Sequence, residues 1–147
     1  MNLREFNDFV SMKKKIKPIL FGLESDKIAD EEDIKTVEEY YGIQLPASYK
    51  EFVQEYGGGY FAHSIIYSCD ENSDFYLLSN NPIEFVGNNN FIAVSDLGTG
   101  DLFGFSINKN ICDARISIYD HEKKSVVETD MHDIFEFISK YGLKIEI

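Results

Sequence analysis

The sequence predicts an α+β fold, in which a single domain has N-terminal helices, a largely antiparallel sheet meander of six strands, and a C-terminal helix packed on one face. Two observations lead to this prediction. Apolar residues recur at helical spacing as far as Gly57-Gly58-Gly59, and after that run they alternate with polar residues in short segments. The chain has 147 residues, of which 44% are hydrophobic, so it can bury a core as one domain over residues 1–147.

Three helices are predicted before the glycine run. The first covers residues 2–16 and ends before Pro18, because proline disfavours helical geometry in the residue that precedes it. The second follows Asp30, whose side chain can cap a helix N-terminus, and ends at Gly42. The third begins with Pro46 at its first helical position. The apolar positions that define these helices are Leu3, Phe6, Val10, Ile34, Val37, Tyr41, Tyr49, Phe52, Val53 and Tyr56.

Strands are predicted after the glycine run, where the hydrophobic period changes to two. The six segments are Ile65–Tyr67, Phe75–Leu78, Phe91–Ser95, Leu102–Ile107, Ile116–Tyr119 and Ser125–Val127. The stretch Asp96–Asp101 contains two glycines and predicts a hairpin loop, whereas the asparagine-rich stretch Ser79–Asn90 predicts a surface loop. Asp130 is the expected cap of the last helix, which ends at Gly142.

Composition argues against several classes of protein. The formal net charge of −12 and the pI near 4.6 argue against direct binding of nucleic acid, whose phosphates would be repelled. No apolar run is long enough to span a bilayer, and the N-terminus lacks the apolar region of a secretory signal. Cys69 and Cys112 are too far apart for a metal knuckle and indicate reduced thiols in a cytoplasmic protein. We therefore expect neither a nucleic-acid nor a membrane partner.

Charge is distributed unevenly along the chain. Residues 1–17 contain five Lys or Arg against two acidic residues, a local charge of +3, so the remaining residues carry −15. A lysine cluster at the end of an amphipathic helix can contact anionic lipid or nucleic acid, but it is more often a solvated helix end. We expect the solvated end.

Three motifs have the composition of reactive or ligand-binding sites. The stretch Asp96–Asp101 lacks the alternating oxygen ligands of a calcium loop, so a hairpin turn is favoured. Asp120, His121 and Glu122 are consecutive, and consecutive strand residues point to opposite faces, so no metal site is predicted. The glycines at 57–59 close a helix, whereas a phosphate loop opens one. Because no nucleophile elbow is present either, we predict no catalytic residues and no cofactor.

Five aromatic residues surround the glycine run and are expected in the core. They are Tyr49, Phe52, Tyr56, Tyr60 and Phe61. Because interface centres are enriched in tyrosine and phenylalanine, any of them that is exposed beside the acidic surface would suit a protein partner.

A longer signature extends from Ile34 to Phe52. It consists of an amphipathic helix with a glutamate, a glycine, Leu-Pro, two further residues, then Tyr and Phe, and a glycine-rich stop follows. Phe103-Gly104-Phe105 and Tyr119-Asp120-His121 come later in the same order. Over about residues 28–141 this succession resembles the SUKH superfamily, with residues 1–17 as a lysine-containing N-terminal helix. The signature positions, to which the resemblance gives structural roles, are Leu45, Pro46, Tyr49, Phe52, Gly57 and Gly58.

The resemblance implies a non-enzymatic protein-binding domain. Bacterial members are similar to immunity proteins of polymorphic toxin systems, which neutralise a cognate toxin, often a nuclease. Fungal members resemble regulatory scaffolds in cell-wall synthesis. An acidic body suits the first role, because a nuclease needs a basic surface that such a body can cover. We therefore expect an immunity protein, with a regulatory scaffold or adaptor as the alternative.

Two groups of acidic residues are candidate contacts with a protein toxin. The first group is Asp70, Glu71 and Asp74, and the second, on strand ends and loops, is Asp96, Asp101, Asp120 and Glu122.

Overall fold

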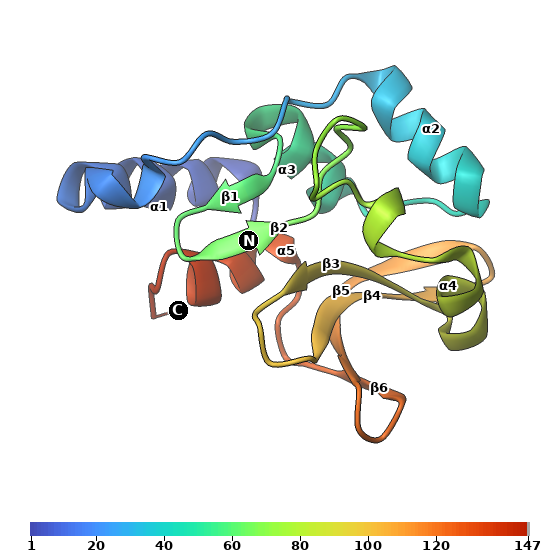
Figure 1. The fold of residues 1–147 in the computed structure, drawn as a ribbon. Coiled ribbons are helices and arrows are strands. Elements are labelled where there is room, and N and C mark those ends of the chain that lie inside the picture. The colour runs from blue at the N-terminus through green and yellow to red at the C-terminus, as the bar shows by residue number, and fades with distance from the viewer. Residues whose placement is uncertain (147) are drawn as a thin grey trace.

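The computed structural model describes residues 1–146 and confirms the α+β fold (Figure 1). Its helices are α1 (Leu3–Ile16), α2 (Glu31–Tyr41), α3 (Ala47–Tyr56), α4 (Ile83–Asn89) and α5 (Ile134–Phe137), the last continued by a π-helical turn over Ile138–Gly142. Its strands are β1 (Gly59–Phe61), β2 (Ser64–Ile66), β3 (Phe91–Asp96), β4 (Leu102–Asn108), β5 (Ile111–Asp120) and β6 (Ser125–Glu128).

The strands form two antiparallel sheets that follow one another in chain order. β1 pairs with β2, and β3, β4, β5 and β6 form a four-stranded sheet. The Tyr67 N–H donates to the Val94 carbonyl at 2.8 Å, and the Ser95 hydroxyl donates to the Ile65 carbonyl at 2.7 Å. These bonds hold the end of β2 against β3, so the meander passes from the small sheet into the large one.

Side-chain caps fix the starts of the first two helices. Asn2 accepts from the Glu5 N–H and Asp30 accepts from the Asp33 N–H, and in both helices the third residue bonds back to the cap. Gly42 ends α2 in the left-handed conformation, with φ of 64°. The predicted cap at Asp30 and stop at Gly42 are confirmed.

Aromatic residues from distant parts of the chain build the core. The Phe6 ring of α1 lies 6.0 Å from Phe52, 6.0 Å from Phe61 and 5.0 Å from Phe135, measured between ring centroids. Phe6 is fully buried and Val10 nearly so, which places the inner face of α1 on the body. α5 packs against α3 and β5, so the last helix covers the same core.

The predicted strand Phe75–Leu78 is wrong. This segment is a loop that ends in a 3-10 turn over Leu78–Asn80, and only Tyr76 makes a strand-like bridge, to Ser68. The Asn80 amide donates to the carbonyls of Asp74 and Tyr76, at 3.1 and 2.8 Å. These local bonds satisfy backbone groups that a strand would have paired with a neighbour.

The predicted surface loop Ser79–Asn90 is also wrong, because α4 occupies most of it. Asn81, just before the helix, is fully buried. Its amide group donates to the Leu77 and Ala93 carbonyls, and its side-chain oxygen accepts from the Ala93 N–H at 2.8 Å. A full set of partners explains how this asparagine lies in the core.

Several boundaries differ from the prediction, and β5 begins at Ile111, ahead of the predicted start at Ile116. The cap of the last helix is Asp133, which accepts from the Glu136 N–H, and not Asp130. Pro46 is the N-cap of α3 and not its first helical residue, a shift of one position. The last of the three glycines begins β1, a strand that the sequence pattern did not indicate because only three residues form it.

Candidate partner-binding face

The signature residues lie in the interior. Tyr49 and Phe52 are fully buried and Leu45 nearly so. The Tyr49 hydroxyl donates to the Tyr67 carbonyl at 2.6 Å, which ties α3 to the chain just after β2. The Leu45 N–H donates to Glu38 on α2 at 2.8 Å. These residues therefore pack in the core and satisfy buried backbone groups.

The glycine run lets another segment pass close to its backbone. Gly57 has φ of 82°, and a Cβ added there would overlap the main-chain carbonyl of Asp26. A Cβ at Gly58 would lie 2.9 Å from the Ile66 carbonyl oxygen. The Asp26 N–H donates to the Gly58 carbonyl at 2.9 Å, and the Ser68 hydroxyl donates to the Asp26 carboxylate at 2.6 Å. The segment after α1 is thus fixed beside the start of β1.

A groove of about 510 Å³ opens between the β1–β2 turn, the loop after β2 and the β3–β4 hairpin. We call it the hairpin groove. It is lined by His63, Ser64, Ile65, Tyr67, Asp74, Phe75, Asn80, Asp96, Leu97 and Gly98. Burial raises the pKa of the Tyr67 phenol, and the nearby Asp96 carboxylate raises it further. The lining combines apolar side chains with carboxylates and offers no metal-ligand or nucleophile geometry.

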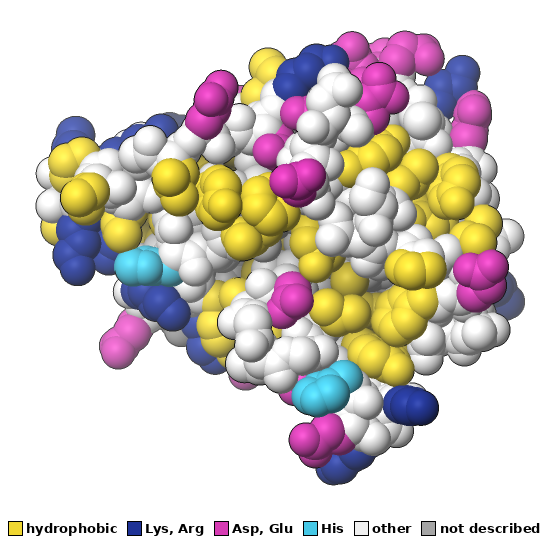
Figure 2. All heavy atoms as spheres, in the orientation of Figure 1, with side chains coloured by type: hydrophobic (Ala, Val, Ile, Leu, Met, Phe, Trp, Pro, Cys, Tyr) yellow, Lys and Arg dark blue, Asp and Glu magenta, His cyan; other side chains and the backbone are white. Residues whose placement is uncertain are grey.

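One aromatic residue beside the groove is exposed. Tyr60 lies on β1, where burial alternates, and 42% of it is accessible to solvent. Its ring packs edge-on against Phe75, with the centroids 5.1 Å apart. The prediction that Tyr60 lies in the core is therefore wrong, whereas Tyr49, Phe52 and Phe61 are buried as predicted. Figure 2 shows hydrophobic side chains across the middle of this face, with acidic ones among and above them.

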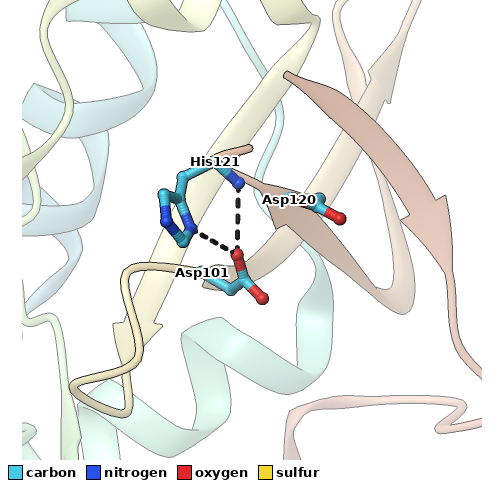
Figure 3. A group of neighbouring side chains, drawn as sticks. All are labelled: Asp101, Asp120 and His121. Carbon is cyan, nitrogen blue, oxygen red and sulfur yellow. Dashed lines mark hydrogen bonds and ion pairs between the residues drawn. The ribbon is translucent and has the colours of Figure 1, made fainter. Parts of the chain in front are cut away.

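A second cluster joins the β3–β4 loop to the β5–β6 turn (Figure 3). The His121 ring Nδ1 lies 2.8 Å from Asp101 Oδ1, and the His121 main-chain N–H donates to the same oxygen. This bond raises the pKa of the imidazole and holds the pKa of the Asp101 carboxyl below its ordinary value. Asp120 contributes a third ligand atom, all three lying within 4.8 Å of one another. These contacts link the β3–β4 loop to the β5–β6 turn through the Asp101 carboxylate and His121.

A larger hollow, of about 600 Å³, lies near the C-terminal end. Its charged lining residues are of both signs, namely Asp130, Glu136 and Glu146 with Lys140 and Lys144. The two cysteines are free and buried, and burial raises the pKa of both thiols to about 12. Neither cysteine is therefore placed as a nucleophile.

Comparison with known families decides the relationship that the signature suggested. A family model described as SMI1-KNR4 cell-wall, SUKH_6, matches residues 31–138. The chain belongs to the SUKH family. A comparison with curated proteins found no match. Membership in the SUKH family fits both an immunity protein and a cell-wall regulator, both of which bind proteins.

Only some of the acidic residues predicted to contact a toxin lie together on one face. Asp74 and Asp96, one from each group, line the same groove. The Asp70 side chain accepts hydrogen bonds from the Lys27 and Asn72 N–H groups, and the Asp120 side chain caps the turn after β5. Both carboxylates therefore stabilise the backbone around them. The remaining acids are Asp101, held by His121, and Glu71 and Glu122, which are exposed on their turns.

Sequence reasoning missed the apolar part of this face. The alternation of faces along a strand predicts that Tyr60 is exposed, because its neighbours Gly59 and Phe61 are both buried. Finding it required β1 to be recognised as a strand. Phe75 and Leu97 gave no such signal, since they come from loops that only the tertiary structure brings together. Among residues 1–146, no helix is long and apolar enough to cross a membrane.

Proposed function

We propose that this SUKH protein is a cytoplasmic immunity protein that neutralises a cognate protein toxin by covering a basic surface of the toxin, without cofactor or turnover. The observation that supports the proposal is the hairpin groove, whose lining joins Phe75 and Leu97 with Asp74 and Asp96, and beside which the exposed Tyr60 ring packs on Phe75. An apolar centre with charges around it is the usual composition of a protein-binding face.

Charge supports the same role. The protein has a net charge of −12, and outside residues 1–17 the chain carries −15. A nuclease or another enzyme that acts on phosphates presents basic side chains, so an acidic partner speeds encounter and excludes the phosphate substrate from the same surface. Neutralisation by occlusion needs no catalytic group in the immunity protein.

The test is capture of a toxin with wild-type protein and with a variant of the groove. Asp74→Lys with Asp96→Asn reduces the negative charge by three, and asparagine at 96 can still accept the 2.7 Å hydrogen bond from the Gly98 N–H. The control is Glu51→Lys with Glu55→Gln, which makes the same charge change at exposed positions of α3.

The proposal expects the wild type and the α3 control to capture a basic polypeptide that the groove variant releases. That polypeptide, expressed alone, should arrest growth, and co-expression of the wild type should restore it. Equal capture by all three proteins would remove the groove from the proposal. A captured protein that is harmless on its own would reject toxin neutralisation.

A regulatory scaffold is the second candidate, and the description of the matched family as cell-wall favours it. The same face would then hold an endogenous protein. Because an apolar contact depends little on ionic strength, weak salt dependence of the captured complex would separate this role from the first.

A further inference from the structure

The far end of α1 and the turn after it expose apolar side chains that the core does not use. The exposed fractions are 43% for Met12, 64% for Ile16, 86% for Ile19 and 62% for Leu23. We call residues 12–23 the α1 tip. Four of the ten large hydrophobic residues that the described part of the chain exposes lie in this short segment, so apolar exposure is concentrated there.

The same segment is basic. Its charged residues are Lys13, Lys14, Lys15 and Lys17, and the nearest acidic residues in sequence are Asp8 and Glu24. Figure 2 shows Lys and hydrophobic side chains side by side at the left-hand end, over α1. Lysines in the last turn favour the negative end of the helix dipole, which accounts for their charge. That explanation leaves the exposed isoleucines unaccounted for.

Part of the tip is attached to the body and part of it is exposed. α1 packs on the core through Phe6 and Val10, and Phe21 of the tip packs edge-on against Phe61 with the ring centroids 5.7 Å apart, whereas Ile16 and Ile19 are exposed. A helix of 14 residues is about 21 Å long, whereas the screening length at physiological salt is about 8 Å. An anionic surface at the tip would therefore experience the four lysines of the tip more strongly than carboxylates that lie more than one screening length away.

We propose that the α1 tip binds an anionic lipid surface, with Ile16 and Ile19 entering the headgroup region and the lysines beside the lipid phosphates. Exposed aliphatic side chains flanked by lysines are the composition of interfacial membrane anchors. The opposite charge of the body orients the molecule so that it meets such a surface tip first. The sequence favoured a solvated helix end because the exposure of Ile16 and Ile19 depends on the fold.

Two other partners fit the tip less well. Single-stranded nucleic acid is bound through stacked aromatic side chains and arginines. The exposed large side chains of the tip are aliphatic or lysine, and its one aromatic ring, Phe21, is half-buried against Phe61. A stable protein interface buries about 800 Å² on each partner, and the tip offers only the last turn of α1 and a 3-10 turn.

The experiment is flotation of the full chain with vesicles of phosphatidylcholine alone and of phosphatidylcholine mixed with phosphatidylglycerol. We expect binding only to the anionic vesicles, and weaker binding as salt is raised. Ile16→Ser with Ile19→Ser should weaken that binding by about tenfold or more. The thermal midpoint should stay unchanged, because both side chains are exposed. The control is Ile111→Ser with Val127→Ser, which removes two side chains exposed to similar degrees (56% and 57%) on β5 and β6.

Equal binding to both kinds of vesicle, or none to either, would overturn the proposal. So would an equal loss of binding in the tip variant and the control. A single-stranded RNA that binds the tip while anionic vesicles do not, or salt-sensitive self-association without vesicle binding, would replace lipid with another partner.

Discussion

Replacing Gly57 with alanine tests how the segment after α1 is held. Gly57 has φ of 82° and ψ of −57°, a backbone conformation that costs a residue with a Cβ about 1–3 kcal/mol of strain. The new Cβ would also overlap the Asp26 carbonyl, so the segment must move. That movement weakens the two hydrogen bonds of Asp26, to Gly58 and Ser68, each contributing about 0.5–1.5 kcal/mol. We expect a total destabilisation of about 2–6 kcal/mol.

Gly87→Ala is the matched control. Gly87 lies inside α4, and a Cβ added there meets no heavy atom within 4 Å. Alanine favours a helix over glycine by about 1 kcal/mol, so this variant should be as stable as the wild type or slightly more stable. Urea unfolding followed by circular dichroism gives both free energies by linear extrapolation.

The reasoning would be refuted if the unfolding free energy of Gly57→Ala lay within about 0.5 kcal/mol of the wild-type value, because the backbone strain alone should destabilise the variant by more than that. A larger loss in Gly87→Ala than in Gly57→Ala would refute it as well. Either result would mean that the connector is not held against the glycine run.

Three further predictions concern individual side chains. NMR titration should give His121 a pKa above the ordinary value of about 6.5, and Asp101→Asn should lower it toward that value, with Asp120 and Glu122 still raising it. Because the folded pKa of this histidine is raised, its contribution to stability is complete below about pH 6.5 and is lost as pH rises through the folded pKa. The difference in unfolding free energy between the wild type and Asp101→Asn should therefore fall over that pH range. A difference that stays the same at all pH values would contradict this prediction. Tyr49→Phe should lower the unfolding free energy by about 1–3 kcal/mol, since a buried carbonyl loses its donor, and an unchanged urea midpoint would disprove that role. Cys69 and Cys112 should react with a thiol reagent only in denaturant, because both are buried with raised pKa values, and rapid labelling of the native protein would show that they are accessible.

Elements set by local chemistry could be predicted from the sequence. Asp30 and Gly42 bound α2 because a side-chain cap and a left-handed glycine act within one turn. The alternation in Phe103 and Phe105 likewise marked β4. Asn81 shows the limit, because its burial depends on carbonyls supplied by Leu77 and Ala93, which no local pattern reveals.

The candidate binding face was predictable only in part. Asp74 and Asp96 were candidates on charge, but their meeting in one groove depends on packing between the loop after β2 and the β3–β4 hairpin. Tyr60 was assigned to the core with the other aromatic residues around the glycine run, and its exposure follows from its outward position on β1, a strand of only three residues. The exposure of Ile19 follows from the turn at Pro18, where the chain reverses with that side chain outward.

Association kinetics test the central claim, that an acidic face covers a basic toxin. The measurement is the rate constant for binding of the wild type to the captured toxin, followed by stopped-flow fluorescence as ionic strength is raised. The association rate constant should fall by about tenfold or more between low and high salt. The variant Asp74→Lys with Asp96→Asn should associate more slowly and dissociate faster than the wild type. The α3 control, Glu51→Lys with Glu55→Gln, should bind far more like the wild type than like the groove variant. A rate constant that does not change with salt, or a groove variant that binds like the wild type, would contradict the account.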